Sequence, residues 1–222
     1  MTYHYGVMLV NYKNYFNNMR VVLDIDDFSV VNNRLDLLLK LKETYPNFKV
    51  SLFTIPVDVK CDWGPYQNRK EFLEEVKKHL DWIQIIPHGY RHEGKEMKYM
   101  SYEVMKETMK YIEEAFNRDG LPFVKGFKAP HWQVSDGVIQ ALDEAGWWLA
   151  VDPRQPKMKK TKKFYCHTQP IDQKLDLDAD VLKLHAHTYG TKNDLGKCMM
   201  NLMPYKMKEA EWCFVTDYIE TK

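Results

Sequence analysis

Two histidines four residues apart follow an apolar run in the segment IIPHGYRHE, residues 85–93. If this segment makes one helical turn, the imidazoles of His88 and His92 point to the same side and can share one cation. The spacing differs from the HExxH helix of zinc proteases, because Gly89 stands at the glutamate position. A histidine pair alone indicates no more than two exposed side chains. The metal interpretation therefore needs a third ligand from elsewhere in the chain.

Two adjacent aspartates, Asp26 and Asp27, follow the apolar run MRVVLDI. Neighbouring carboxylates repel each other and are costly to desolvate, so a fold keeps them beside a buried strand when a cation or hydrogen-bond donors offset that cost. One aspartate alone could cap a helix, but the pair favours a metal or catalytic role. An aspartate together with His88 and His92 would form a facial set that leaves coordination positions open for water and substrate.

Further residues that could join such a site follow the later apolar runs: Lys128, His131, Trp132, Asp152, His185 and His187. Five of the eight histidines thus lie at the ends of apolar runs. Because the carboxyl ends of parallel strands meet at one edge of a sheet or barrel, we expect these side chains to gather there.

The elements that must position these residues alternate along the chain. Apolar and β-branched runs predict strands at 19–25, 48–56, 81–87, 124–130, 147–153 and 180–189. Amphipathic segments predict helices at 33–46, 68–80, 101–120 and 135–146, with Ser101 as an N-cap and Gly120 as a C-terminal stop. This alternation predicts an α/β fold with a mainly parallel sheet, either closed into a complete or partial barrel or open and doubly wound.

Composition narrows the class of partner. The 222 residues show no internal repeat or linker, so we expect a single domain, residues 1–222. With 32 basic and 31 acidic residues the net charge is +1, which gives no field toward nucleic acid or anionic lipid. A small molecule or an oligosaccharide is the expected partner, with neither nucleic acid nor membrane. The oligomeric state stays open.

The chain also carries features that bear on its compartment. The first twenty residues lack the basic and apolar regions of a signal peptide, and no apolar run approaches the ~20 residues that span a bilayer. The four cysteines are widely separated and form no CxxC pair. We therefore expect a cytoplasmic protein with reduced thiols.

Four motifs in order, LDIDDFS, HGYRHE, FKAPHW and LKLHAHT, resemble those of the polysaccharide deacetylases with a NodB homology domain. This family is also called carbohydrate esterase family 4, and the likeness is greatest to its divergent deacetylase-like branch. It extends over residues 21–189 and implies a distorted or incomplete (β/α)7 barrel. It also implies one divalent cation, Zn²⁺ foremost, with Co²⁺, Ni²⁺ or Mn²⁺ as alternatives, and the removal of N- or O-acetyl groups from sugars.

The resemblance assigns roles to individual positions. Asp26 matches the catalytic base, and the metal ligands match Asp27, His88 and His92. His185 aligns best with the late histidine that protonates the leaving group, but His187 lies on the same face of its strand, so both alternatives stay open.

The stretch KAPHW matches the family motif Arg-x-Pro and the residues after it. Lys128 and Pro130 fall on that motif, and Trp132 falls where an aromatic side chain lines the pocket. His131 could line the pocket too or face solvent.

Several positions depart from the family pattern. Phe28 and Ser29 stand where glycine is usual, and Gly89 replaces a common serine or threonine. Lys128 replaces the arginine that would hold the base aspartate with a bidentate fork, and a lysine offers only a point charge. The expected function is a metal-dependent deacetylase. The alternatives are a catalytically silent carbohydrate-binding module on the same barrel and a metal-dependent amidohydrolase that cleaves another C–N bond.

Overall fold

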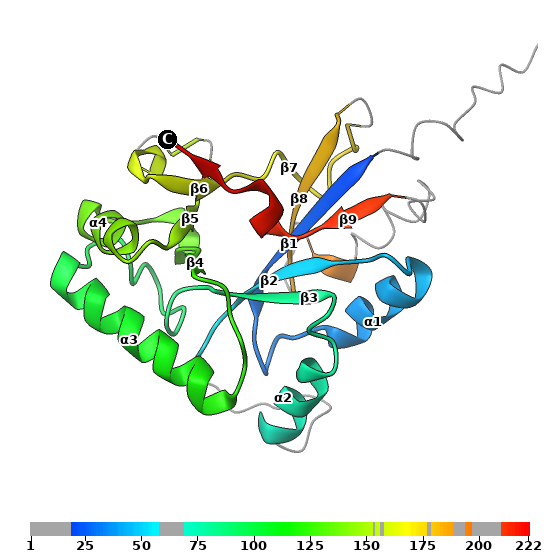
Figure 1. Cartoon of the computed structure of the whole chain (residues 1–222), viewed down its shortest axis with the longest axis horizontal. Coiled ribbons are helices and arrows are strands. Elements are labelled where there is room, and N and C mark those ends of the chain that lie inside the picture. Colours follow the sequence, from blue (N-terminus) through cyan, green and yellow to red (C-terminus); the bar gives the residue numbers. More distant parts are fainter. Residues whose placement is uncertain are drawn as a thin grey trace, which may run out of the picture.

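Strand β1 (Arg20–Phe28) lies at the centre of a six-stranded sheet in the computed structural model of the protein (Figure 1). The strand order is β3-β2-β1-β8-β7, and β9 pairs with β1 as well. All of these pairings are parallel. The other strands are β2 (Val50–Thr54), β3 (Ile83–Pro87), β7 (Gln169–Pro170), β8 (Val181–His187) and β9 (Glu211–Cys213). The structure describes residues 19–57, 69–152, 154–155, 158–176, 179–188, 194–196 and 210–222.

A second sheet continues the first one. It has the order β10-β6-β5-β4 and consists of β4 (Gly126–Phe127), β5 (Trp148–Ala150), β6 (Lys163–Tyr165) and β10 (Glu220–Thr221). Its pairings are parallel except that of β10 with β6. The two sheets meet just beyond β3 and β4, where a single parallel bridge joins His88 to Lys128. The strands therefore curve into an incomplete barrel, with the ends of β3 and β4 brought side by side.

Among the described residues, four helices with both ends defined lie on the periphery of the strands (Figure 1). They are α1 (Leu35–Thr44), α2 (Arg69–Lys77), α3 (Tyr102–Asp119) and α4 (Asp136–Glu144). Ser101 caps α3 and Ser135 caps α4, each through a side-chain oxygen that accepts a backbone N–H. Gly120 ends α3 in the left-handed conformation at φ 61°. These helices and caps confirm the sequence-based expectation.

Six strands of the described residues were predicted from the sequence, and four short ones were not. The six predicted strands correspond to β1, β2, β3, β4, β5 and β8. The strands β6, β7, β9 and β10 were not predicted. Two or three residues are too few to show a period of two, although β4 and β5, which are equally short, were predicted. The prediction for β1 stopped too early, since the strand continues to Phe28 and includes both Asp26 and Asp27. This longer strand decides the geometry of the site.

Two expectations from composition can be compared with the described residues. No helix in those ranges is both long and apolar enough to cross a bilayer. Cys213 is a free thiol, and Sγ of Cys166 lies 3.4 Å from the carbonyl oxygen of His167. Cys61 and Cys198 lie outside the described residues.

Candidate active site

A β-bulge at the end of β1 brings two consecutive aspartates to one place. Side chains alternate between the two faces of a regular strand, so Asp26 and Asp27 would point in opposite directions. The register of β1 with β2 shifts between Ile25 and Phe28, and Asp27 has φ 63°. Such bulges are common next to functional sites, where they re-aim a side chain. Here the bulge lets both carboxylates face the group of histidines beyond the strand ends.

Asp27, His88 and His92 converge from two separate strand ends. Each offers a ligand atom, and these atoms all lie within 4.8 Å of one another. Oδ1 of Asp27 lies 3.1 Å from Nε2 of His92 and 3.4 Å from Nε2 of His88. This oxygen is buried and accepts no hydrogen bond from the described residues. A divalent cation requires such a set of donor atoms: one buried carboxylate oxygen without a hydrogen bond and two imidazole nitrogens that face it.

Hydrogen bonding prepares His88 to bind a cation. Its Nδ1 lies 3.0 Å from the carbonyl oxygen of Lys128, across the bridge between the two sheets. A carbonyl oxygen only accepts, so Nδ1 carries the proton and Nε2 presents its lone pair toward Asp27. Ligand histidines in metal sites are commonly oriented in this way.

Lys128 is the buried cation of the site, with an exposed fraction of 0%. Its Nζ lies 2.5 Å from Oδ1 of Asp26 and 3.7 Å from Oδ1 of Asp24, and it sits 3.9 Å above the ring of Trp132. Burial alone would raise the pKa of Asp26, but Lys128, His185 and His88 outweigh it and hold that pKa below its ordinary value. Asp26 is therefore ionised near neutral pH.

Charge also indicates one divalent cation. Asp24, Asp26 and Asp27 are buried carboxylates, and Lys128 is the one buried ammonium beside them among the described residues. With neutral histidines the group carries a net charge of −2, which is unfavourable in a desolvated site. Burial would raise the pKa of Asp27, yet the hydrogen bond from His187 and the nearby imidazoles of His88 and His92 hold it far below its ordinary value. One divalent cation would neutralise the site.

His185 and His187 lie on neighbouring positions of the same strand face, as their spacing predicted. In the register of β1 with β8, His185 stands opposite Asp24 and His187 opposite Asp26. Nδ1 of His185 lies 2.6 Å from Oδ1 of Asp24, and Nδ1 of His187 lies 2.9 Å from Oδ2 of Asp27. The two Nε2 atoms are 3.3 Å apart. The His185 side chain is 4% exposed and that of His187 is 31% exposed, so only His187 reaches the surface substantially.

The segment Pro130–Trp132 forms a short 3-10 turn beside the histidines. His131 and Trp132 both have positive φ, at 55° and 56°, a conformation that is costly for residues other than glycine and is concentrated at functional sites. The Trp132 ring lies 5.8 Å from that of His185, and the His131 ring lies 5.5 Å from that of His92. His131 is exposed, whereas Pro130 is buried.

Three residues of the site were not assigned a role from the sequence. Asp24 accepts hydrogen bonds from His185 and from the Tyr165 hydroxyl, which lies 3.2 Å from its Oδ2. The ring of His167 stacks on that of His185 at 4.8 Å, and burial lowers the pKa of His167 to about 4. Asp24 follows the same apolar run as Asp26 and shares its strand face, which is the signal in the sequence that points to a role in the site. Tyr165 ends the short strand β6 and His167 lies just after it, and neither gave a sequence signal.

Asp152 follows β5, a position with two alternatives: a partner for Lys128 or a histidine, or the start of a turn before Pro153. Its carboxylate accepts three hydrogen bonds from Arg154, one from the backbone and two from the guanidinium group. The backbone N–H of Gln155 also donates to the carbonyl oxygen of Asp152, so Asp152 begins a turn.

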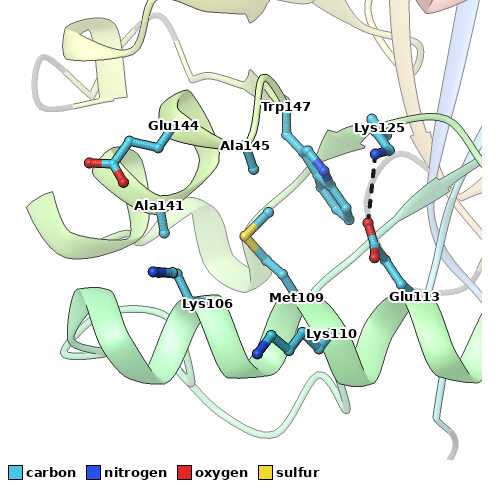
Figure 2. A pocket seen from close by; sticks show the side chains of 9 residues that line it. All are labelled: Lys106, Met109, Lys110, Glu113, Lys125, Ala141, Glu144, Ala145 and Trp147. Carbon is cyan, nitrogen blue, oxygen red and sulfur yellow. Dashed lines mark ion pairs between the residues drawn. The ribbon is translucent and has the colours of Figure 1, made fainter.

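A separate groove of about 330 Å³ lies between α3 and α4 (Figure 2). Trp147 and Met109 contribute apolar surface to it, and an ion pair joins Lys125 to Glu113. None of the aspartates and histidines described above lines this groove. Its lysines are exposed, so we assign the chemistry of the protein to the Asp/His group.

Comparison with known proteins places the fold. No protein-family model matches the sequence, and no curated protein matches it either. Among solved structures, the chain is similar to the chitin deacetylase of the fungal pathogen Colletotrichum lindemuthianum, with 15% identity and a TM-score of 0.58 over 89% of this chain and 86% of the other. A family 4 acetyl xylan esterase from Clostridium thermocellum, in complex with a cobalt ion, is similar at 14% identity and a TM-score of 0.57 over 89% of both chains.

A pseudoenzyme of carbohydrate esterase family 4 from Bacillus anthracis is similar as well, with 16% identity and a TM-score of 0.56 over 91% of this chain and 66% of the other. These three proteins share one architecture, although two are named as enzymes and the third as a pseudoenzyme. At such identities the likeness establishes architecture, and it agrees with the fold that the four motifs implied. The chain therefore has the distorted (β/α)7 barrel fold of the polysaccharide deacetylases, carbohydrate esterase family 4.

Proposed function

We propose that the protein is a metal-dependent hydrolase that removes N- or O-acetyl groups from a carbohydrate or amino sugar. The observation that carries the proposal is the convergence of Asp27, His88 and His92 around a buried carboxylate oxygen that accepts no hydrogen bond from the described residues. These three residues would hold one divalent cation, Zn²⁺ foremost. When bound, such a cation polarises a carbonyl group and lowers the pKa of a bound water molecule toward neutrality.

Asp26 is the proposed general base. Its carboxylate is ionised because Lys128 holds its pKa down, and its Oδ2 lies 3.9 Å from Nε2 of the ligand His88. A carboxylate at this position can accept the proton of an attacking water molecule. Lys128 takes the place of the family's arginine and holds one oxygen of Asp26, which leaves Oδ2 available.

His185 is the proposed general acid. Its Nδ1 donates to Asp24, so Nε2 is the nitrogen that would carry a transferable proton. Burial and the charge of Lys128 hold the pKa of His185 well below its ordinary value, so an imidazolium formed here is a strong acid that gives this proton up readily. If His187 donates from Nδ1 to Asp27, its Nε2 carries a lone pair. This lone pair lies 3.3 Å from Nε2 of His185 and can accept a hydrogen bond from a proton on that nitrogen. This arrangement favours His185 as the donor to the leaving amine or alkoxide. It favours His187 as the residue that orients Asp27.

The fold by itself does not distinguish a hydrolase from a binding module, since one similar structure is a pseudoenzyme. The residue set favours the hydrolase, because a carbohydrate-binding groove has no need of a buried base, a dyad of Asp24 with His185 and a cation site together. Trp132 and His131, with Pro130 beneath them, would contact the substrate.

Elemental analysis of the purified protein, followed by acetate release from N- and O-acetylated sugars and from a chromogenic acetate ester, tests the proposal. We expect one divalent ion per chain and turnover that a chelator abolishes and added Zn²⁺ restores. Sugar binding without acetate release would instead support the binding module. Turnover restricted to other amides would support the amidohydrolase.

A further inference from the structure

The turn that carries both proposed metal histidines, residues 88–92, wraps around the carboxylate of Glu96. Oε1 of Glu96 accepts hydrogen bonds from the backbone N–H of Tyr90 at 2.9 Å and of His92 at 3.2 Å. Oε2 lies 3.4 Å from the backbone nitrogen of Arg91. Three successive backbone N–H groups thus converge on one carboxylate, an arrangement that binds anions well.

The backbone of this turn needs such support. Gly89 has φ 63° and His92 has φ 57°. A histidine in the left-handed region is strained, and it keeps this conformation only when neighbouring groups impose it. Glu96 accepts the N–H of His92 itself, and the next residue, Met97, is fully buried and anchors Glu96 from the core.

The carboxylate of Glu96 lies directly against the backbone of Gly89. A Cβ atom added at Gly89 would lie 2.2 Å from Oε1 of Glu96 and 2.6 Å from Cγ of Pro130. The carboxylate therefore occupies the space that a side chain at position 89 would need. This explains why the chain has glycine where the related motif commonly has serine or threonine.

We propose that Glu96 is a positioning residue for the metal site, which holds His92 in its strained conformation and so aims its Nε2 at the cation. The inference rests on the proposed metal site. Glu93 lies closer to His92 in sequence, but its side chain is exposed. The acceptor for this turn is Glu96.

The experiment compares Glu96→Met, Glu96→Gln and the matched control Glu93→Met in the full chain, with Co²⁺ as the probe. E96M keeps the length of the side chain but removes the acceptor, so we expect a ten- to hundredfold loss of Co²⁺ affinity and an altered Co²⁺ absorption spectrum. E96Q keeps an acceptor oxygen and should recover most of the affinity. E93M should bind Co²⁺ as the wild type does.

Amide hydrogen exchange of the metal-free protein gives a readout that does not depend on the cation. We expect faster exchange at Tyr90 and His92 in E96M than in wild type or E93M, because their common acceptor is gone. Should E96M fail to fold, Glu96→Asp withdraws the carboxylate by one methylene and is expected to shift both readouts in the same direction.

Wild-type Co²⁺ affinity and wild-type amide exchange in E96M, or in E96D in its place, would overturn the role of Glu96. A wild-type protein that binds no divalent ion would instead overturn the proposed function, and amide exchange would still report on Glu96. The two failures are therefore distinguishable.

Discussion

The Nζ of Lys128 lies 2.5 Å from Oδ1 of Asp26, and both side chains are buried beneath the histidines of the site. Lys128 comes from the segment after β4 and Asp26 from the end of β1, so this ion pair joins the two sheets. Removing one partner of a buried pair leaves the other charge uncompensated, which costs more than the pair contributes when intact.

Lys128→Met is accordingly expected to lower the free energy of unfolding by about 3–5 kcal/mol. The exposed Lys125→Met is the matched control and should change stability by less than about 0.5 kcal/mol. Urea unfolding of both variants measures the difference. The double variant D26N/K128M should lose less than the sum of the single losses, because the two side chains contact each other. A K128M protein as stable as K125M would contradict the charge assignment.

Replacing Asp27 is expected to weaken metal binding, whereas replacing Asp26 is expected to lower kcat. Asp27→Asn should weaken binding of the divalent ion strongly, since it deletes the ligand carboxylate. Asp26→Asn should retain the ion and lower kcat by roughly 10²- to 10⁴-fold, the range of a general base. Metal content by elemental analysis and acetate release on the same preparations give both values. Normal rates in both variants would refute the assignment.

Asp24 holds His185 in the orientation that the proposed acid needs. Asp24→Asn should lower kcat by roughly 10²-fold or more, with metal content and KM little changed. His185→Gln should behave in the same way, whereas His187→Gln should mainly weaken metal binding, by about 10- to 100-fold, through Asp27. If H187Q rather than H185Q lost kcat at full metal occupancy, the roles of the two histidines would be exchanged.

His167 is buried, and its folded pKa of about 4 lies below the ordinary histidine value of about 6.5. The unfolded chain therefore takes up a proton at His167 before the folded chain does. The contribution of neutral His167 is fully present above about pH 6.5 and is lost as the pH falls toward 4. The loss is at most on the order of 3 kcal/mol. Urea unfolding of metal-free protein between pH 7 and 4 should show a steeper decline for wild type than for His167→Gln, and equal slopes would contradict the burial argument.

Sequence patterns predicted the elements whose hydrophobic pattern extends over several turns or whose ends carry a capping residue. The leucines of α1, the serine caps of α3 and α4 and the glycine after α3 each act over a few neighbouring residues, so local chemistry suffices to locate them. The expectation of one domain over residues 1–222 and of a cytoplasmic location stays a prediction.

The sequence by itself determined which side chains are available for chemistry and the order in which they follow the strands along the chain. Hydrophobic periodicity shows approximately where a strand ends, and these residues come next. Only the tertiary structure decided which of them meet. The bulge that turns Asp27 toward His88 and His92, the register that sets Asp24 opposite His185, and the carboxylate of Glu96 inside the histidine turn all depend on contacts between strands or across a folded loop. Such contacts depend on how separate elements pair and pack, and no period within one segment encodes them.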